Sequence, residues 1–419
     1  MTLIDRVVAE VDRAADEIVQ LTADLVRIPT VNPPGEAYEA CAWLIGDRLA
    51  QCAFEVELLP ADGRPEHTSI HPRINVVGSR GSGRPVLHLN GHFDVVPAGD
   101  GWTVDPFAGI VREGRIIGRG ACDMKAGLAA AIFAAEALRR AGAARGTIEI
   151  SGTVDEESGG FAGVAWLAER GRIAKAHTDY VIIPEPLDVD RICIGHRGVY
   201  WFELTTHGRI AHGSMPFLGS SAIEAMSRVI ESIACDLTPR LTERTTAMPV
   251  VPDEARHPTI NVNGIDGGQP VDGIQTPCVA DRCRAVFDRR FLIEEGFDAV
   301  KAEMAELVRR SLDGAAGIEH NIRDLMVVHP TRTPEGSPLV GALDRAIHHV
   351  LGQPARLVAS PGTYDQKHVA RIAGVEHCVA YGPGRLELAH QPDEWCAVED
   401  LLNATKVIAL AMLDLSGQA

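Results

Sequence analysis

The stretch GTIEISGTVDEESGG, residues 146–160, joins a strand-like segment to three consecutive acids and a pair of glycines. The alternating residues of GTIEISGT predict a β-strand, and the glycines predict a turn into the next helix. Acids after a strand usually form a solvated turn, and this is the interpretation for Asp155. Glu156 and Glu157 raise a second hypothesis, because open α/β sheets bind ligands at the carboxyl ends of their strands.

Strands and helices alternate on both sides of this stretch. RINVVGS (73–79) and PVLHLNGHFDVV (85–96) are predicted to form a strand pair around the turn RGSGR, followed by a helix at MKAGLAAAIFAAEALRRAG (124–142). After the stretch come a predicted helix, GFAGVAWLAERG, and a strand, YVIIPE (180–185). Strands interleaved with helices of this length predict an α/β fold with a mostly parallel sheet flanked by helices.

The pattern changes near residue 195. Between residues 196 and 324, two helices and about four strands joined by long connections predict an inserted α+β domain with an antiparallel sheet. The α/β pattern then resumes. Residues 1–195 and 325–419 are therefore predicted to form one catalytic domain around the insertion.

A set of histidines and carboxylates stands where the predicted strands and their loops end. The set consists of His92, Asp123, Glu156, Glu157, Glu185 and His390. Each has an ordinary explanation on its own, as a core histidine, a helix cap or a loop residue. Their shared placement favours a common site, because these segment ends meet at one edge of such a sheet.

Two histidines with three or more carboxylates are a ligand set for two divalent ions, zinc first among them. Such an ion pair activates water and polarises a carbonyl, while a carboxylate that is not a ligand moves the proton to the leaving nitrogen. Glu156 and Glu157 suit this division, because neighbouring side chains on an extended segment point to opposite sides. Asp94, two residues after His92, is a candidate for orienting the imidazole ring.

Composition argues against several other classes of function. The net charge of −17, with no Lys/Arg-rich block, argues against nucleic acid or an anionic membrane as a partner. The acidic, amphipathic N-terminus is not typical of a signal peptide, and no apolar run is long enough to span a membrane, so a cytoplasmic protein is expected. The segment GSRGSG leads into a strand instead of a helix, which argues against a phosphate-binding loop.

With these residues identified, the chain resembles the metal-dependent deacylase and peptidase family. That family includes acetylornithine deacetylase, succinyl-diaminopimelate desuccinylase, aminoacylase and glutamate carboxypeptidase. The resemblance covers nearly the whole chain and rests on the blocks NGHFDVVPAGDGWTVDPFAG, GRGACDMKAGLAA, VDEESGG and AHQPDE. It implies two divalent ions, zinc with cobalt or manganese as substitutes.

The resemblance also implies a role for each residue of the set. Asp123 would bridge the two ions, with His92 and Glu185 completing one site. Glu157 and His390 would complete the other. The remaining roles are a general acid/base at Glu156, a support for His92 at Asp94, and a cis peptide at Asp123–Met124.

The inserted domain would be the family's dimerisation and lid domain, which implies a homodimer. Its block GRIAHGSMP contains His212, which would reach the partner subunit's active site and stabilise an oxyanion. In FDRRF, Arg290 is the candidate clamp for a substrate carboxylate, with Arg289 as the alternative. Gly362 and Thr363 would contact substrate.

Two departures leave the substrate open. Asp272 replaces the family's usual asparagine, and the continuation Tyr364–His368 matches neither the acetylornithine nor the desuccinylase pattern. The leading hypothesis is hydrolysis of the amide bond of an N-acyl amino acid or related small carboxylate. A dipeptidase or carboxypeptidase with the same metal core is the alternative. An inactive metal-binding homologue that acts as an interaction protein is a third, disfavoured because every metal ligand and Glu156 are present.

Overall fold

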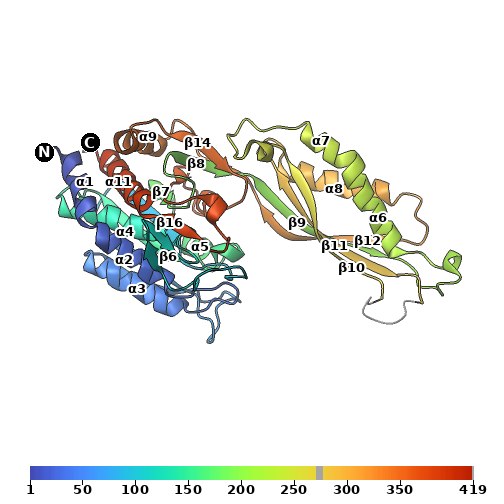
Figure 1. Cartoon of the computed structure of the whole chain (residues 1–419). Helices are drawn as coiled ribbons and strands as arrows, with labels where there is room; N and C mark the ends of the chain where they lie inside the picture. The colour runs from blue at the N-terminus through green and yellow to red at the C-terminus, as the bar shows by residue number, and fades with distance from the viewer. Residues whose placement is uncertain (270–276, 418–419) are drawn as a thin grey trace. The chain divides into compact units, whose positions relative to one another are not determined.

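The computed structural model describes residues 1–269 and 277–417, so Asp272 lies outside the described residues. The chain divides into two compact units (Figure 1). Unit 1 comprises Met1–Gly195, Arg332–Val358 and Tyr364–Ala419, and unit 2 comprises His196–Thr331 and Ala359–Thr363.

Unit 1 has the α/β architecture expected from the sequence. Its helices are α1 (Leu3–Arg13), α2 (Ala15–Val26), α3 (Tyr38–Gln51), α4 (Lys125–Arg140), α5 (Val164–Glu169), α9 (Pro338–Leu351), α10 (Gln366–Arg371) and α11 (Val398–Leu415). The large sheet contains β1 (Glu55–Pro60), β2 (Ile74–Gly81), β6 (Thr147–Thr153), β3 (Val86–His92), β7 (Tyr180–Ile183), β15 (Cys378–Ala380), β8 (Arg191–His196) and β13 (Thr331–Arg332) in that order, with β14 (Arg356–Ser360) paired to β8. A small sheet is formed by β16 (Trp395–Ala397), β5 (Arg115–Ile117) and β4 (Ile110–Arg112).

The centre of the large sheet is parallel and buried. β6, β3, β7 and β15 run parallel to one another, and every residue of β3 is buried. α4 packs against β3 and β6, and its alanine-rich sequence is buried almost throughout. In Figure 1, α1, α2, α4 and α11 lie together beside this sheet. Burial on both faces explains why these strands are continuous apolar runs.

The predicted pairing of the strands at 73–79 and 85–96 is wrong. β2 pairs antiparallel with β6, and β6 pairs parallel with β3, so β6 lies between the two strands. The chain leaves β3 through α4 and returns as β6, the helical crossover by which parallel neighbours are joined. RGSGR therefore connects two strands that are not neighbours.

Unit 2 is an α+β unit. Its antiparallel sheet has the order β10 (Thr259–Gly267), β11 (Arg282–Phe291), β9 (Gly198–His207) and β12 (Glu319–Val328). α6 (Ala222–Ser232), α7 (Thr238–Thr242) and α8 (Phe297–Ser311) complete it, with α6 and α8 side by side (Figure 1). Alternate residues of β11 are buried, and Phe202 stacks on Phe287 with ring centroids 4.9 Å apart in the core beneath the helices.

The fold class predicted from the sequence, α/β with an α+β insertion, is confirmed by these two units. Within the part of the chain that the structure describes, no helix is long and apolar enough to cross a membrane.

Candidate metal centre

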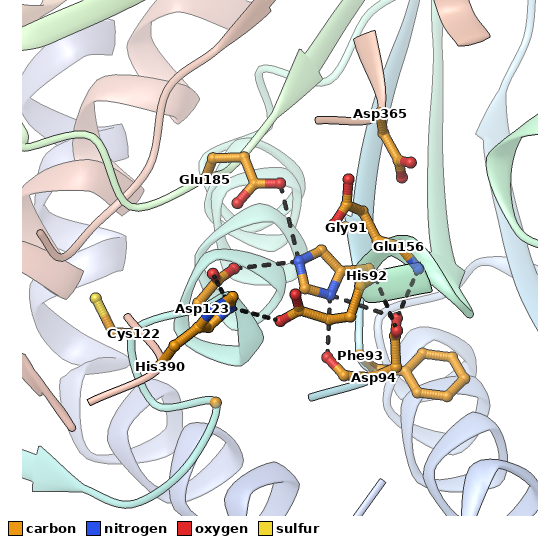
Figure 2. Close-up of polar contacts among 12 residues, drawn as sticks. Gly91, His92, Phe93, Asp94, Cys122, Asp123, Glu156, Glu185, Asp365 and His390 are labelled. Carbon is orange, nitrogen blue, oxygen red and sulfur yellow. Dashed lines mark hydrogen bonds and ion pairs between the residues drawn. The ribbon is translucent and has the colours of Figure 1, made fainter. Parts of the chain in front are cut away.

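The ends of three neighbouring strands carry three of the five predicted ligands, and loops elsewhere in unit 1 bring Asp123 and His390 to the same place (Figure 2). His92 is the last residue of β3, and Glu185 follows β7, which pairs with β3. Glu157 lies in the turn after β6, the other neighbour of β3. At Gly127 an added Cβ would lie 1.9 Å from the Pro184 carbonyl oxygen, so glycine lets α4 approach the segment that carries Glu185.

Asp123 lies between two pairs of side chains. Its Oδ1 is 3.2 Å from His92 Nε2, which is also 3.8 Å from Glu185 Oε1. Its Oδ2 is 3.4 Å from His390 Nε2, which is 3.1 Å from Glu157 Oε1. One carboxylate thus faces a histidine and a glutamate on each side.

Asp123 is not a helix cap, since α4 begins at Lys125 and its N-cap, Met124, makes no side-chain cap bond. The peptide between Asp123 and Met124 is cis, as expected from the resemblance. The Asp123 carboxylate faces the two histidines instead of the first turn of α4.

The charges of the set fit divalent cations. Burial raises the pKa of Glu157 to about 7, and burial and the charge of Asp123 raise the pKa of Glu185 well above its usual range. Bonds with Asp123 and Glu157 raise the pKa of His390 to about 10. Burial opposes protonation of His92, but the carboxylates of Asp123 and Asp94 still raise its pKa well above the usual value.

These shifts have one cause in common, which is negative charge crowded into a buried space. A divalent cation bound there would supply the positive charge that this space favours. Ligand atoms of His92, Asp123 and Glu157 lie within 4.8 Å of one another, so residues assigned to the two different sites come close together around Asp123. The donor set, imidazole nitrogen with carboxylate oxygen, is one that zinc accepts.

The Glu156–Glu157 pair lies in a 3-10 turn, Glu156–Ser158, and not on an extended segment. The strand alternation expected from the sequence therefore does not separate the two side chains. Instead, Asp94 fixes the turn: its Oδ1 accepts a bond from the Glu156 backbone N–H at 3.1 Å, and its Oδ2 accepts one from Glu157 at 3.2 Å. The divergence of the two carboxylates comes from this turn.

Asp94 supports His92 chiefly through its backbone. His92 Nδ1 is 3.0 Å from the Asp94 carbonyl oxygen and 3.5 Å from its carboxylate. A proton on Nδ1 leaves Nε2 free to ligate on the side of Asp123 and Glu185. Asp94 thus contacts the ring that it is predicted to orient, and it also binds the acidic turn, a contact that the sequence does not predict.

Asp155 is buried, and its interpretation as a solvated turn residue is wrong. Its Oδ2 accepts a bond from Arg73 Nε at 2.9 Å, and its Oδ1 accepts one from the Tyr38 hydroxyl at 2.8 Å. The residue has a φ of 62°, which turns the chain from β6 into the acidic turn. The ion pair with Arg73 compensates the burial of this charge.

Two further charged residues act near the ligands. Glu394 Oε1 accepts backbone bonds from Gly120, Cys122 and Asp123 at 3.0, 2.8 and 3.1 Å, and its Oε2 pairs with Arg119 at 2.6 Å. Glu394 thereby fixes the loop that carries Asp123. The Lys367 ammonium lies 3.0 Å from Glu156 Oε1. Neither role has a signal in the spacing of the sequence, because the partners are more than 200 residues apart.

The other predicted site residues belong to unit 2 and are described within it. His212 is exposed, and its Nδ1 accepts bonds from the Ser214 backbone N–H at 3.2 Å and hydroxyl at 2.8 Å. The ring proton of the neutral imidazole therefore lies on Nε2, where it can be donated. Gly362 donates its N–H to Ser360 Oγ at 3.2 Å, beside Thr363.

The two arginines of FDRRF differ in their surroundings. Arg289 is fully buried and pairs with Glu295 at 2.6 Å, so it belongs to the core of unit 2. Arg290 donates two hydrogen bonds to the Asp288 carboxylate, from Nε at 2.7 Å and from Nη2 at 2.9 Å, and its side chain remains partly exposed. Of the two arginine side chains, that of Arg290 is the one partly open to solvent.

Comparison with known proteins assigns the family. The model of "Peptidase family M20/M25/M40" matches residues 88–414. The chain belongs to the M20 peptidase family. Succinyl-diaminopimelate desuccinylase from Methylobacterium nodulans is 31% identical over 407 residues, which cover 92% of this chain and 93% of that protein.

Solved M20 structures share the fold. An M20 metallo-carboxypeptidase from Sulfolobus solfataricus has a TM-score of 0.75 and 20% identity, covering 96% of this chain and 99% of that one. A dinuclear metal-binding M20 peptidase from Bacillus subtilis has a TM-score of 0.71 and 16% identity, covering 97% and 100%. The expected enzyme class, a metal-dependent amidohydrolase of this family, is confirmed.

Proposed function

We propose that this M20 enzyme hydrolyses the amide bond of an N-acyl amino acid, with an N-succinyl diamino acid as the first substrate to test. The observation that carries the proposal is Asp123, whose two oxygens face His92 with Glu185 on one side and His390 with Glu157 on the other. The substrate class is supported by the desuccinylase relatives, 28–31% identical over most of their length.

The five ligands would hold two divalent ions, zinc being the metal proposed, with cobalt or manganese as substitutes. Bound ions supply two things, a lowered pKa of water and a polarised substrate carbonyl. The chain's own contribution is to hold the ligands rigidly. Asp94 fixes His92 and the acidic turn, and Glu394 fixes the loop of Asp123.

Glu156 is proposed to carry the proton of the reaction. Its carboxylate accepts a proton from the attacking water as the oxygen adds to the carbonyl carbon. The same group then gives that proton to the amide nitrogen as the C–N bond breaks. The second proton of the water leaves the new carboxylic acid and goes to the amine or to solvent, so the products are a carboxylate and an ammonium group and the water is fully accounted for.

A hydrolysis screen tests this function. N-succinyl, N-acetyl, N-formyl and N-carbamoyl amino acids and dipeptides are incubated with the protein and added zinc, cobalt or manganese. We expect an N-acyl amino acid to be the fastest substrate and EDTA to abolish turnover. Faster cleavage of dipeptides would favour the peptidase alternative, and no cleavage of any compound with any metal would favour the inactive homologue.

We also propose that the enzyme is a homodimer through unit 2, with His212 acting in the partner's active site. The support lies in two properties of this segment. Phe217, in the same segment as His212, is 76% exposed, and Ile210, Met215 and Leu218 are exposed as well. The Nε2 proton of His212 could be donated to an oxyanion. A cytoplasmic location stays a prediction.

Mixed dimers test the role of His212. Dimers assembled from His212→Ala subunits and Glu156→Gln subunits are expected to recover activity that each variant lacks alone, because one site receives both an intact Glu156 and an intact His212. Activity of affinity-purified heterodimers is compared with that of each homodimer. Verified heterodimers without recovery would place His212 in its own chain's site, and a monomer by light scattering would remove the dimer altogether.

A further inference from the structure

Lys367 lies in the block Tyr364–His368, which departs from the patterns of related enzymes. We infer that Lys367 is a positioning residue that holds the Glu156 carboxylate in place and aims it for proton transfer. The inference rests on the proposed function of Glu156 as the general base.

The ion pair between these residues is close and shielded from solvent. Lys367 Nζ lies 3.0 Å from Glu156 Oε1, and the two side chains are 6% and 12% exposed. A shielded charge-assisted bond is stronger and more directional than a surface pair, whose geometry water and salt average out. The bond engages Oε1, so Oε2 is the atom left to receive a proton.

The helix that carries Lys367 is fixed to the sheet and to the acidic turn. Asp365, just before α10, accepts a bond from Asn90 Nδ2 on β3 at 2.8 Å. His368 Nε2 lies 2.7 Å from the Gly159 carbonyl oxygen, in the turn that carries Glu156. An ammonium on a long, flexible stem is thus presented from a rigid base.

The acidic turn is shaped to receive α10. Gly160 has a φ of 74°, and an added Cβ would lie 2.7 Å from Asp365 Oδ1 and 3.3 Å from the His368 ring. Because residue 160 is a glycine and has no side chain, α10 can approach the turn closely. Lys367 and Glu156 face each other across this contact. Backbone packing therefore fixes the relative position of the two side chains, in addition to the attraction of their charges.

The surroundings make a cation beside Glu156 useful. Glu156 lies in a run of acids with Asp155 and Glu157, and the charge of Glu156 also acts on Glu185 and Asp365. Lys367 brings a positive charge directly to the Glu156 carboxylate, without occupying a ligand position of the metal centre.

A double-mutant cycle tests the inference. Lys367→Met removes the charge at similar volume, Lys367→Arg keeps it, and each is made in the parent and in Glu156→Gln. The control is Lys175→Met, which removes an exposed Lys–Glu pair of similar length, 2.9 Å. Hydrolysis of the best substrate from the screen gives kcat and KM, and mass spectrometry gives bound zinc.

We expect Lys367→Met to lower kcat roughly 10- to 100-fold, as loss of a supporting contact in such sites does. KM and zinc content should stay near the parent's, Lys367→Arg should recover part of the loss, and Lys175→Met should change nothing. In the Glu156→Gln background, Lys367→Met should cost no further kcat. The melting temperatures of the EDTA-treated variants should also be non-additive, which reports the ion pair without any substrate.

Additive losses in kcat, or a parent-like kcat for Lys367→Met, would overturn the inference while Glu156 keeps its role. A Glu156→Gln variant with parent activity would instead overturn the proposed function. If Lys367→Met does not fold, Lys367→Gln replaces it, judged by the same cycle. If no substrate is found, additive melting temperatures count against the ion pair and so against the inference.

Discussion

Replacement of Glu156 by glutamine is expected to lower kcat about 10²- to 10⁴-fold, the usual contribution of a positioned general base. Glutamine keeps the size of the side chain and cannot accept the proton of water. Because Glu156 is not one of the five proposed ligands, bound zinc should remain at the parent's level. Steady-state kinetics and metal analysis of the same preparation check both statements.

Glu157→Gln is the matched comparison for this result, since it makes the same chemical change one residue away. In the parent protein Glu157 Oε1 lies 3.1 Å from His390 Nε2, so we expect the Glu157→Gln variant to lose one ion. Parent-like activity of Glu156→Gln would exclude it as the base. Equal loss of metal in both variants would mean that the two glutamates share the ligand role.

The second large effect is expected for Asp123→Asn. Both oxygens of Asp123 face ligand pairs, at 3.2 Å from His92 and 3.4 Å from His390, so one substitution should weaken both metal sites. Activity at limiting zinc should fall below detection, and dialysed protein should hold fewer ions than Glu157→Gln. Plasma mass spectrometry after dialysis gives the metal content.

Asp100→Asn serves as the control for Asp123→Asn, because Asp100 is an exposed aspartate outside the centre. It should keep parent activity and metal content. An Asp123→Asn protein that retains one tightly bound ion would show that Asp123 serves a single site, and the assignment as a bridge would then be wrong.

The predictable part of the site follows from the ends of strands. β3 and β7 are neighbouring parallel strands, so the residues that close them, His92 and Glu185, had to lie near each other. The same rule places Glu157 beyond β6. The pattern of strands and helices was also readable, because buried parallel strands are continuous apolar runs and α4 is a long apolar helix.

The predictions that are wrong concern features set by contacts between residues far apart in sequence, or by the geometry of turns. The pairing of β2 was assigned to β3 because the two are consecutive, whereas the crossover through α4 put β6 between them. Asp155 looked solvated because its partners, Arg73 and Tyr38, come from distant segments. The support that Glu394 gives to the loop of Asp123 could not be predicted either, because the two residues are far apart in the sequence.

Zinc titration of the EDTA-treated protein shows whether two ions held by this set drive amide hydrolysis. Bound zinc and hydrolysis of an N-succinyl amino acid are measured in the same samples as zinc is added. We expect no turnover without zinc and full activity once both sites formed around Asp123 are filled. Turnover that persists with no metal bound would exclude a metal-driven reaction.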